Sequence, residues 1–296
     1  MFKLLFNLLA NLPLSMLYGL SHLLYVIGYK VFGYRRRIVT KNISKSFPDL
    51  SEEKINKIKE GFYKQFFQVW VETLKSKKFN GQEWNRRVDL KGIDLLNQHL
   101  ATGQSVILMS GHAANWEWSG SAIGRAVKGQ MTVFFKPVKN ESFGKEIHSI
   151  REKQGIKAIS KDNALRYLIK SKNTPQVIGM ISDQSPSIGT EKYWMNFLNQ
   201  ETAFYQGAEK FATSMNYPVY YANMHRVSKG FYELELVSIY DGKSEIKQGE
   251  IIKRFAQHLE NTIKDNPSDY LWSHKRWKYT KEEAAELTGR PYLFIS

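Results

Sequence analysis

The stretch SVILMSGHAANWEW, residues 105–118, joins a short apolar run to a polar motif. An apolar, β-branched run of this length predicts a buried strand, which we expect to end at Gly111. A helix is expected to follow the motif and to continue to Val127. Ligands of open α/β sheets bind at the carboxyl ends of strands, so His112 stands where a functional site would lie.

Apolar strands and amphipathic helices alternate on both sides of this stretch. Further strands are predicted at residues 130–138, 156–160, 175–184, 217–227 and 230–240. Helices are predicted at residues 51–75, 90–103, 141–155, 163–172 and 247–267. This interleaving predicts an α/β fold with a mixed sheet covered by helices. No linker is evident within residues 35–296, which are therefore expected to form one domain.

The N-terminal segment is the most apolar part of the chain. From Leu4 to Tyr29 it carries no Asp, Glu, Lys or Arg, and a helix of about 20 such residues crosses a bilayer core. Several polar residues lower its apolarity, so a helix lying in the membrane interface is the alternative to a spanning helix. A buried helix pair, interrupted at Pro13 and Gly19, is the third interpretation. Residues 1–34 are therefore predicted to be an apolar membrane helix or an interfacial one.

The charge of the chain indicates an anionic partner. Its 43 Lys and Arg residues exceed its 28 Asp and Glu residues, which gives a net charge of +15. Nucleic acid, an anionic membrane, an acidic protein and a phosphorylated substrate all fit this charge. Lys30, Arg35, Arg36 and Arg37 follow the apolar segment, and positive flanks remain on the cytoplasmic side of a membrane. The chain has no cysteine, which excludes disulfides, thiolate metal ligands and a cysteine nucleophile.

His112 and Glu117 form a candidate catalytic pair. Five positions along a regular helix rotate by about 500°, which would place the two side chains about 140° apart. If Ser110 and Gly111 turn the chain before the helix, Glu117 can reach back to His112. The pair would then supply a general base and the carboxylate that holds its tautomer. The alternative is a hydrogen-bonded core histidine.

Other reaction types lack their motifs in this sequence. No GxSxG elbow supplies a serine nucleophile, so the imidazole of His112 would deprotonate the acceptor itself, as in direct acyl transfer. HExxH is absent, and no nearby His or Asp completes a set of metal ligands. Neither a helix-turn-helix nor an RNP-like segment appears, which argues against nucleic acid as a partner.

The motif SGHAANWEW resembles the His-x4-Glu motif of the lipid A biosynthesis acyltransferases, the late lauroyl and myristoyl transferases. These are related to the glycerolipid acyltransferases, which carry His-x4-Asp. Further segments resemble this family in the same order along nearly the whole chain: YRRRIVTKNISKSFPDLS, IREKQG, ISDQSP, FYQGAEKFATSMNYPVYYANMHR and PSDYLWSHKRWK. The resemblance implies a glycerolipid-acyltransferase-like fold and a membrane-bound enzyme. Such an enzyme would transfer a fatty acyl group to a hydroxyl of a lipid A precursor or related glycolipid.

The resemblance also implies roles for catalytic residues. His112 is the implied base and Glu117 its partner. Arg151 is the implied stabiliser of negative charge, on the thioester oxyanion or on a substrate phosphate, because its guanidinium keeps its charge and presents forked donors. Without the family, Arg151 would be a surface residue paired with Glu146 or Glu152.

Three further residues are implied to bind substrate. Asp183 and Gln184, at a strand end, would border the cleft, although capping of a helix or turn is the alternative for Asp183. Asn115 and the backbone amides at the helix start could bind the oxyanion. An acyl chain needs an apolar slot, for which the candidates, all with core packing as the alternative, are Trp116, Trp118, Phe134, Phe135 and Trp194.

The implied donor is a thioester of acyl carrier protein, with acyl-CoA as the alternative, and neither a cofactor nor a metal is implied. Acyl carrier protein is strongly acidic, so a basic face would steer it. An anionic membrane is the other expected partner. The expected location is the bacterial inner membrane, with the catalytic domain, residues 35–296, on the cytoplasmic face.

Two other functions stay open at this point. One is a lysophospholipid or glycerol-phosphate acyltransferase, against which Glu117 and the late Trp-x-His motif argue. The other is a basic protein of the membrane surface without chemistry. The acyl chain length and the acceptor hydroxyl are likewise open, because related enzymes on one fold act on different lipids.

Overall fold

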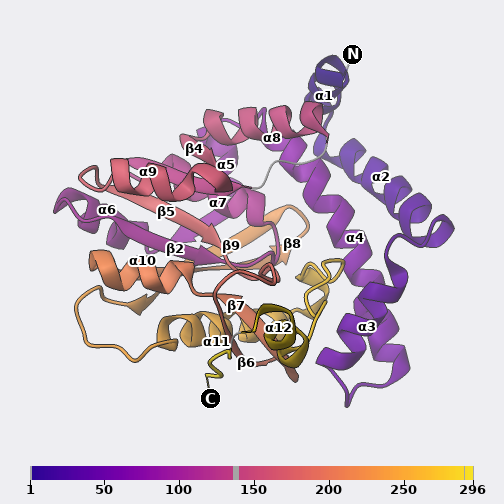
Figure 1. The fold of residues 1–296 in the computed structure, drawn as a ribbon. Coiled ribbons are helices and arrows are strands. Elements are labelled where there is room, and N and C mark those ends of the chain that lie inside the picture. The colour runs from indigo at the N-terminus through magenta and orange to yellow at the C-terminus, as the bar shows by residue number, and fades with distance from the viewer. Residues whose placement is uncertain (1, 136–139, 290, 296) are drawn as a thin grey trace.

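The computed structural model describes residues 2–135, 140–289 and 291–295 (Figure 1). Its centre is a seven-stranded sheet in the order β1-β9-β8-β2-β5-β3-β4. The strands are β1 (Val88–Lys91), β2 (Val106–Ser110), β3 (Gln130–Phe135), β4 (Ile156–Ser160), β5 (Gln176–Ile181), β8 (Val219–Ser228) and β9 (Phe231–Tyr240). β8 and β9 pair antiparallel, and the other neighbouring strands pair parallel. The predicted mixed sheet is therefore confirmed.

Helices cover both faces of this sheet because its central strands are apolar on both sides. In β2, residues 106 and 108 belong to one buried cluster, and residues 107 and 109 belong to another. The helices that contribute to these two clusters include α6 (Ile93–Ala101) and α7 (Trp116–Ala126) in the first, and α10 (Gly207–Met215) and α11 (Glu250–Asp265) in the second. Figure 1 shows α10 and α11 on the opposite side of the sheet from α7. A strand covered on both faces requires a continuous apolar run, which β2 has.

The helices predicted from the sequence are present in the structure. They are α4 (Glu52–Ser76), α6, α8 (Glu141–Lys153), α9 (Ala164–Lys170) and α11. Ser51 caps α4, because its hydroxyl accepts a hydrogen bond from the backbone N–H of Lys54. The strand predicted at residues 130–138 is β3, which ends at Phe135, and residues 136–138 lie outside the described residues.

The sequence patterns do not predict every element. They miss the short strand β1 and an antiparallel hairpin, and the helices α3, α5 and α12. The bounds of these elements are β6 (Lys192–Phe197), β7 (Gln200–Tyr205), α3 (Arg36–Ser46), α5 (Gly81–Arg87) and α12 (Lys281–Thr288). The hairpin turn places Leu198 and Asn199 at φ of 51° and 59°, as a type I′ turn requires. Its sequence signal is weak because glycine, which usually marks such turns, is absent from it.

The N-terminal segment forms two helices rather than one. α1 (Phe2–Asn11) ends before Pro13, and α2 (Leu14–Tyr25) follows and continues into a π-helical turn, Val26–Val31. Proline lacks an N–H and disfavours helical backbone at the residue before it, which explains the break. Within the described part of the chain, no helix is both long and apolar enough to cross a membrane. The predicted spanning helix is therefore corrected to a broken pair that packs against α4 (Figure 1).

This helix pair carries many exposed apolar side chains. Leu17 and Tyr25 are buried. The exposed large apolar side chains of α1, α2 and the residues after them, which we call the N-terminal apolar surface, are Leu4, Leu5, Leu8, Met16, Leu23, Leu24, Ile27, Val31, Phe32 and Tyr34. Exposed apolar side chains that gather in one region of a protein mark an interaction surface.

Candidate active site

His112 lies in a loop between β2 and α7, at the carboxyl end of the strand. Gly111 lets Leu259 of α11 pack closely against this loop, because a Cβ atom on it would lie 2.5 Å from Cδ1 of Leu259. Ala114 adopts a φ of 50°, in the left-handed region that non-glycine residues rarely occupy. The chain therefore turns before the helix begins, as predicted, and His112 stands outside the helix.

The carboxylate that contacts His112 is Asp183. Its Oδ1 lies 2.7 Å from Nδ1 of the imidazole, and its Oδ2 accepts a hydrogen bond of 3.0 Å from the backbone N–H of His112. β2 and β5 are neighbouring parallel strands with Ser110 opposite Ile181, so the two residues leave the same edge of the sheet. When Nδ1–H is donated to the carboxylate, Nε2 carries the lone pair that can accept a proton.

Asp183 is buried and carries a negative charge. Burial opposes this charge, but the imidazole of His112, its two hydrogen bonds to the carboxylate and the buried guanidinium of Arg276 together lower the pKa of Asp183 below its usual value. A carboxylate in this state stabilises the imidazolium that forms when Nε2 takes a proton. The hydrogen-bonded pair of His112 and Asp183 can therefore support general base catalysis.

Gln184 and Trp116 flank the imidazole of His112. Nε2 of Gln184 lies 3.4 Å from Nε2 of His112, and the indole of Trp116 meets the imidazole edge to face at 5.2 Å between centroids. The His112 side chain is 15% exposed. Within the described ranges, no three His, Asp or Glu side chains lie close enough to hold a metal ion.

Glu117 contacts Arg151 and not His112, so the predicted contact of Glu117 with His112 is wrong. Nε and Nη2 of Arg151 donate to the two carboxylate oxygens of Glu117, at 3.1 and 2.7 Å. Glu117 lies in the first turn of α7 and Arg151 in the last turn of α8. The physical reason is that Asp183 already occupies Nδ1 of His112, while a forked guanidinium satisfies both oxygens of Glu117.

The three residues expected to be catalytic thus belong to two pairs, His112 with Asp183 and Glu117 with Arg151. The family model described as bacterial lipid A biosynthesis acyltransferase matches residues 3–279, which include all four of these residues. The protein belongs to this family. It is an acyltransferase of lipid A biosynthesis, which decides against a membrane-surface protein without chemistry. No curated protein sequence matches the chain significantly.

In this acyltransferase, the segment after α11 supports the loop that carries His112. The backbone carbonyl of Asp269 accepts a hydrogen bond of 2.9 Å from the N–H of Ala114. The N–H of Leu271 donates to the carbonyl of His112 at 3.1 Å. The loop is thereby held along its length by a segment that lies more than half the chain away in sequence.

The same C-terminal segment also supports the loop that carries Asp183. Nε2 of His274 accepts a hydrogen bond of 3.1 Å from the backbone N–H of Ser185. Burial lowers the pKa of His274 to about 4, so its imidazole is neutral and able to accept this bond. The sequence predicts no role for His274, although the late Trp-x-His motif that contains it was the available signal.

The side chain of Asn115 forms hydrogen bonds inside the protein, with α7 and α4. Its Oδ1 accepts a hydrogen bond of 3.0 Å from the N–H of Trp118 and so caps α7, while its Nδ2 donates to Oε2 of Glu72 at 2.7 Å. The whole residue is buried. The expected contact of its side chain with the oxyanion is therefore corrected to a role inside the acyltransferase fold.

The aromatic residues expected at an acyl slot fall into different environments. Trp118 and Trp194 are core residues of two buried clusters, whereas Phe134 and Phe135 are half-buried on β3. Trp116 lines a recess between α4 and the loop of His112. The recess has a volume of ≈ 10 Å³, which is room for about one water molecule. It is too small in this structure to hold an acyl chain.

Proposed function

We propose that this acyltransferase moves a fatty acyl group from a thioester of acyl carrier protein to a hydroxyl of a lipid A precursor, with His112 as the general base. The observation that carries the proposal is the 2.7 Å contact between Nδ1 of His112 and Oδ1 of Asp183. A histidine that deprotonates a hydroxyl needs an imidazole in a fixed tautomer and a partner that stabilises the imidazolium, and this contact supplies both.

The reaction follows from this arrangement. Nε2 of His112 takes the proton of the acceptor hydroxyl while the hydroxyl oxygen bonds to the thioester carbonyl carbon. The carbonyl oxygen becomes negatively charged in the tetrahedral intermediate, and the C–S bond then breaks. The leaving thiolate takes the proton from the imidazolium, which returns His112 to its neutral form. The ester forms without a covalent bond to the enzyme.

Arg151 is the proposed stabiliser of negative charge, and Glu117 the residue that holds it. Two hydrogen bonds fix the guanidinium against the first turn of α7, the helix that follows His112. The Arg151 side chain is 21% exposed, so a substrate phosphate or the oxyanion can approach it. Permanent charge and forked geometry suit arginine to both anions.

The proposed attachment is interfacial, at the cytoplasmic face of the bacterial inner membrane. The N-terminal apolar surface supplies the side chains that would enter the lipid, as in helices that lie in the membrane plane. Exposed basic residues follow it at Lys30, Arg35, Arg36 and Arg37. Each would contribute about 1 kcal/mol near anionic headgroups.

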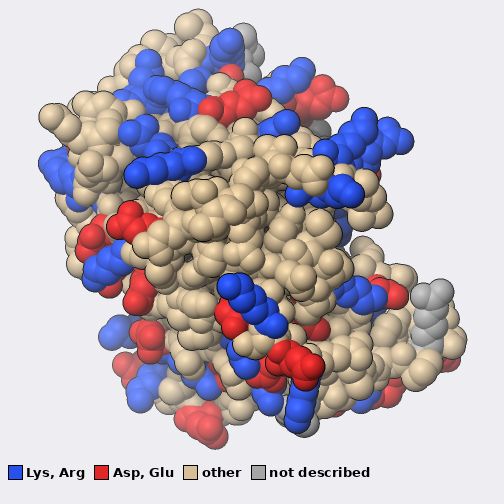
Figure 2. Space-filling model, turned by 90° about the vertical axis from the view of Figure 1, so that its left-hand side faces the viewer, with Lys and Arg blue, Asp and Glu red and all other residues tan. Residues whose placement is uncertain are grey.

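The charge distribution supports acyl carrier protein as donor. With a net charge of +15, the chain attracts an acidic protein. Figure 2 shows that Lys and Arg outnumber Asp and Glu over the upper half of the face that lies at the left of Figure 1. Acyl-CoA, which is also anionic, is the donor that the assay must distinguish.

The test is acyl transfer by the purified full chain on anionic vesicles that contain a lipid A precursor. Acyl carrier protein thioesters and acyl-CoA of the same chain lengths are compared as donors. We expect an acylated lipid from the carrier protein thioester, and a loss of at least about a hundredfold in kcat for His112→Ala and Asp183→Asn. Wild-type turnover by His112→Ala would contradict the general base, and equal use of acyl-CoA would contradict the donor.

A further inference from the structure

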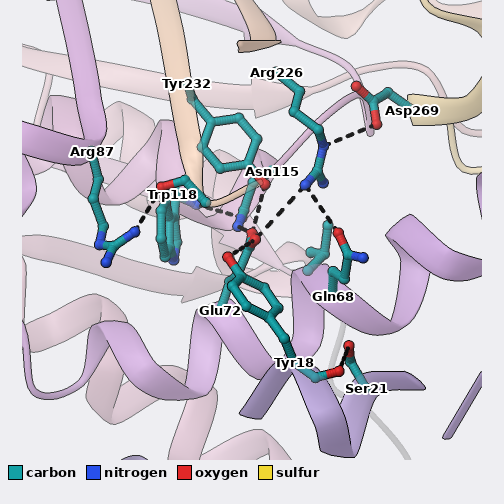
Figure 3. A network of polar contacts seen from close by, with 12 residues as sticks. Tyr18, Ser21, Gln68, Glu72, Arg87, Asn115, Trp118, Arg226, Tyr232 and Asp269 are labelled. Atoms are coloured by element: carbon teal, nitrogen blue, oxygen red, sulfur yellow. Dashed lines mark hydrogen bonds and ion pairs between the residues drawn. The ribbon is translucent and has the colours of Figure 1, made fainter. Parts of the chain in front are cut away.

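Glu72 is a buried carboxylate at the centre of a polar network (Figure 3). It lies near the end of α4, and its side chain is 0% exposed. Its oxygens accept hydrogen bonds from Tyr18 Oη at 2.8 Å, Asn115 Nδ2 at 2.7 Å and Tyr232 Oη at 2.6 Å. Nη1 of Arg226 lies 3.8 Å from Oε1. The network supplies the polar partners that a buried carboxylate requires.

These partners come from four separate parts of the chain. Tyr18 belongs to α2, Asn115 to the loop of His112, Arg226 to β8 and Tyr232 to β9. Removing one partner of a buried charge is costly, because the charge then lacks compensation. Glu72 is therefore fully paired only when all of these elements are in place. The positions of these elements depend on one another through this carboxylate.

Two members of the network hold the loop of His112 directly. Asn115 caps α7. The backbone carbonyl of Asp269 accepts a hydrogen bond of 2.9 Å from the N–H of Ala114. The carboxylate of Asp269 accepts a hydrogen bond of 3.3 Å from Nε of Arg226. Between these two attachments Ala114 has a φ of 50°. Such a conformation persists only where the surrounding structure enforces it. Weakening either attachment should therefore release the loop beside His112.

Tyr18 brings the N-terminal helices into the same network. Burial and the neighbouring carboxylate of Glu72 raise the pKa of Tyr18, so its hydroxyl stays protonated and donates. Another tyrosine of α2, Tyr25, donates a comparable hydrogen bond of 2.9 Å to Glu60 of α4. Glu60 forms its ion pair with Lys64 on the same helix. Each tyrosine thus joins α2 to α4 by one hydrogen bond to a glutamate. Only the glutamate bound by Tyr18, which is Glu72, also accepts a hydrogen bond from the loop of His112.

We propose that Glu72 is a positioning residue for acyl transfer, which holds the loop between His112 and Glu117 through Asn115 and couples that loop to the seating of α2 through Tyr18. The inference rests on the proposed role of His112. Glu72 is buried behind the loop, so it acts on the placement of the base and not on the binding of donor. Its loss should therefore lower kcat and leave KM for the donor unchanged.

Hydrogen exchange tests the coupling without any substrate. Tyr18→Phe removes one hydroxyl and keeps the ring, whereas replacing Glu72 itself would disturb all four elements. In the full chain we expect amide exchange in residues 111–118 to rise about tenfold in Tyr18→Phe, because the loop opens more often. Tyr25→Phe is the matched control and should leave exchange in these residues unchanged. No rise in Tyr18→Phe, or an equal rise in both variants, would overturn the coupling.

A double-mutant cycle tests the effect on turnover. Asn115→Ser keeps a capping oxygen for α7 but loses the amide donor to Glu72. We expect Tyr18→Phe and Asn115→Ser each to lower kcat about tenfold. The kcat of the double variant should be only slightly below that of the less active single variant, because both substitutions act through the same carboxylate. Adding Tyr25→Phe to Asn115→Ser should change kcat no further.

The outcomes separate this inference from the proposed function. Losses of kcat that multiply in the double variant, or changes confined to KM, would overturn the role of Glu72 in positioning. Wild-type turnover by His112→Ala would instead remove the general base, while the exchange measurement would still report whether Tyr18 and the loop are coupled.

Discussion

The imidazole of His274 is neutral and accepts a hydrogen bond, although charged side chains lie near it. Its imidazole receives the N–H of Ser185 and so holds the loop that carries Asp183. Burial is the main cause that lowers its pKa, the nearby charge of Asp183 opposes the shift, and the charge of Arg276 adds to it. A protonated Nε2 could not accept this hydrogen bond. The charge state of His274 therefore affects the loop that carries Asp183.

The shifted pKa of His274 predicts a loss of stability in mild acid. The pKa is about 4 in the folded chain, against 6.5 for an unperturbed histidine, so the unfolded chain binds this proton first as the pH falls. The free energy of unfolding should therefore decrease as the pH falls from about 6.5 toward about 4, by about 3 kcal/mol at most. Urea unfolding of the full chain at pH 7 and pH 5 measures this decrease.

His274→Gln is the control for that measurement, because its side-chain oxygen can still accept the N–H of Ser185 but does not titrate. The decrease in the free energy of unfolding between pH 7 and pH 5 should be smaller in this variant. Equal decreases in the two proteins would assign the acid sensitivity to other groups.

The helices α7 and α8 are joined at the site by Glu117 and Arg151. Both side chains are largely buried, with exposures of 11% and 21%, and each oxygen of Glu117 has a donor from Arg151. Removing the cation leaves a mostly buried carboxylate without its partner. The pair therefore links the helix that follows His112 to the helix that borders β4.

Arg151→Ala is expected to lower both stability and transfer. We expect a loss of about 1–3 kcal/mol in the free energy of unfolding, because Glu117 is left unpaired, and a loss of about a hundredfold in kcat. The double variant Glu117→Gln/Arg151→Ala removes the unpaired charge and should regain part of the stability but none of the activity. Activity that returns together with stability would show that the pair is structural only. Urea unfolding and the transfer assay measure the two effects.

The basic N-terminal region contacts the C-terminal segment that supports the loops of His112 and Asp183. Nδ2 of Asn42 in α3 donates to the carbonyls of Trp272 and His274, at 2.8 and 2.9 Å. The basic N-terminal region and the C-terminal signature therefore hold one another in place. Because α1 and α2 pack on α4 beside this junction, the N-terminal apolar surface has a fixed position relative to His112 (Figure 1).

Membrane binding is expected to depend on this surface. Val31 and Phe32 are 69% and 79% exposed, and burying one large apolar side chain in lipid contributes about 1.5–3 kcal/mol. The double variant Val31→Ser/Phe32→Ser should therefore bind anionic vesicles at least about tenfold more weakly, with an unchanged thermal midpoint. Vesicle sedimentation of the full chain measures the affinity.

The matched control replaces two apolar residues of similar exposure on α9, at the other side of the molecule. Leu165 and Ile169 are 68% and 61% exposed, and Leu165→Ser/Ile169→Ser should leave vesicle affinity unchanged. Equal losses in the two double variants would mean that binding does not use the N-terminal apolar surface.

The features of the site that the sequence predicts depend on residues close together in the chain, whereas the features that it does not predict depend on residues far apart. The bend of the chain before α7 and the position of His112 just after a strand are local properties, and the structure shows both. The partner of His112 lies 71 residues away, just after a strand whose position in the sheet no local pattern reveals. Glu117, the carboxylate close to His112 in sequence, was therefore assigned to it in error.

The sequence by itself determined the alternation of strands and helices, the family and the position of His112 at the end of a strand, because apolar periodicity and short motifs are read within a few residues. The tertiary structure alone decided which carboxylate meets His112, which cation meets Glu117 and which groups surround Glu72. These contacts depend on strand order and helix packing. A buried charge needs a partner, and it pairs with the groups that the fold places next to it.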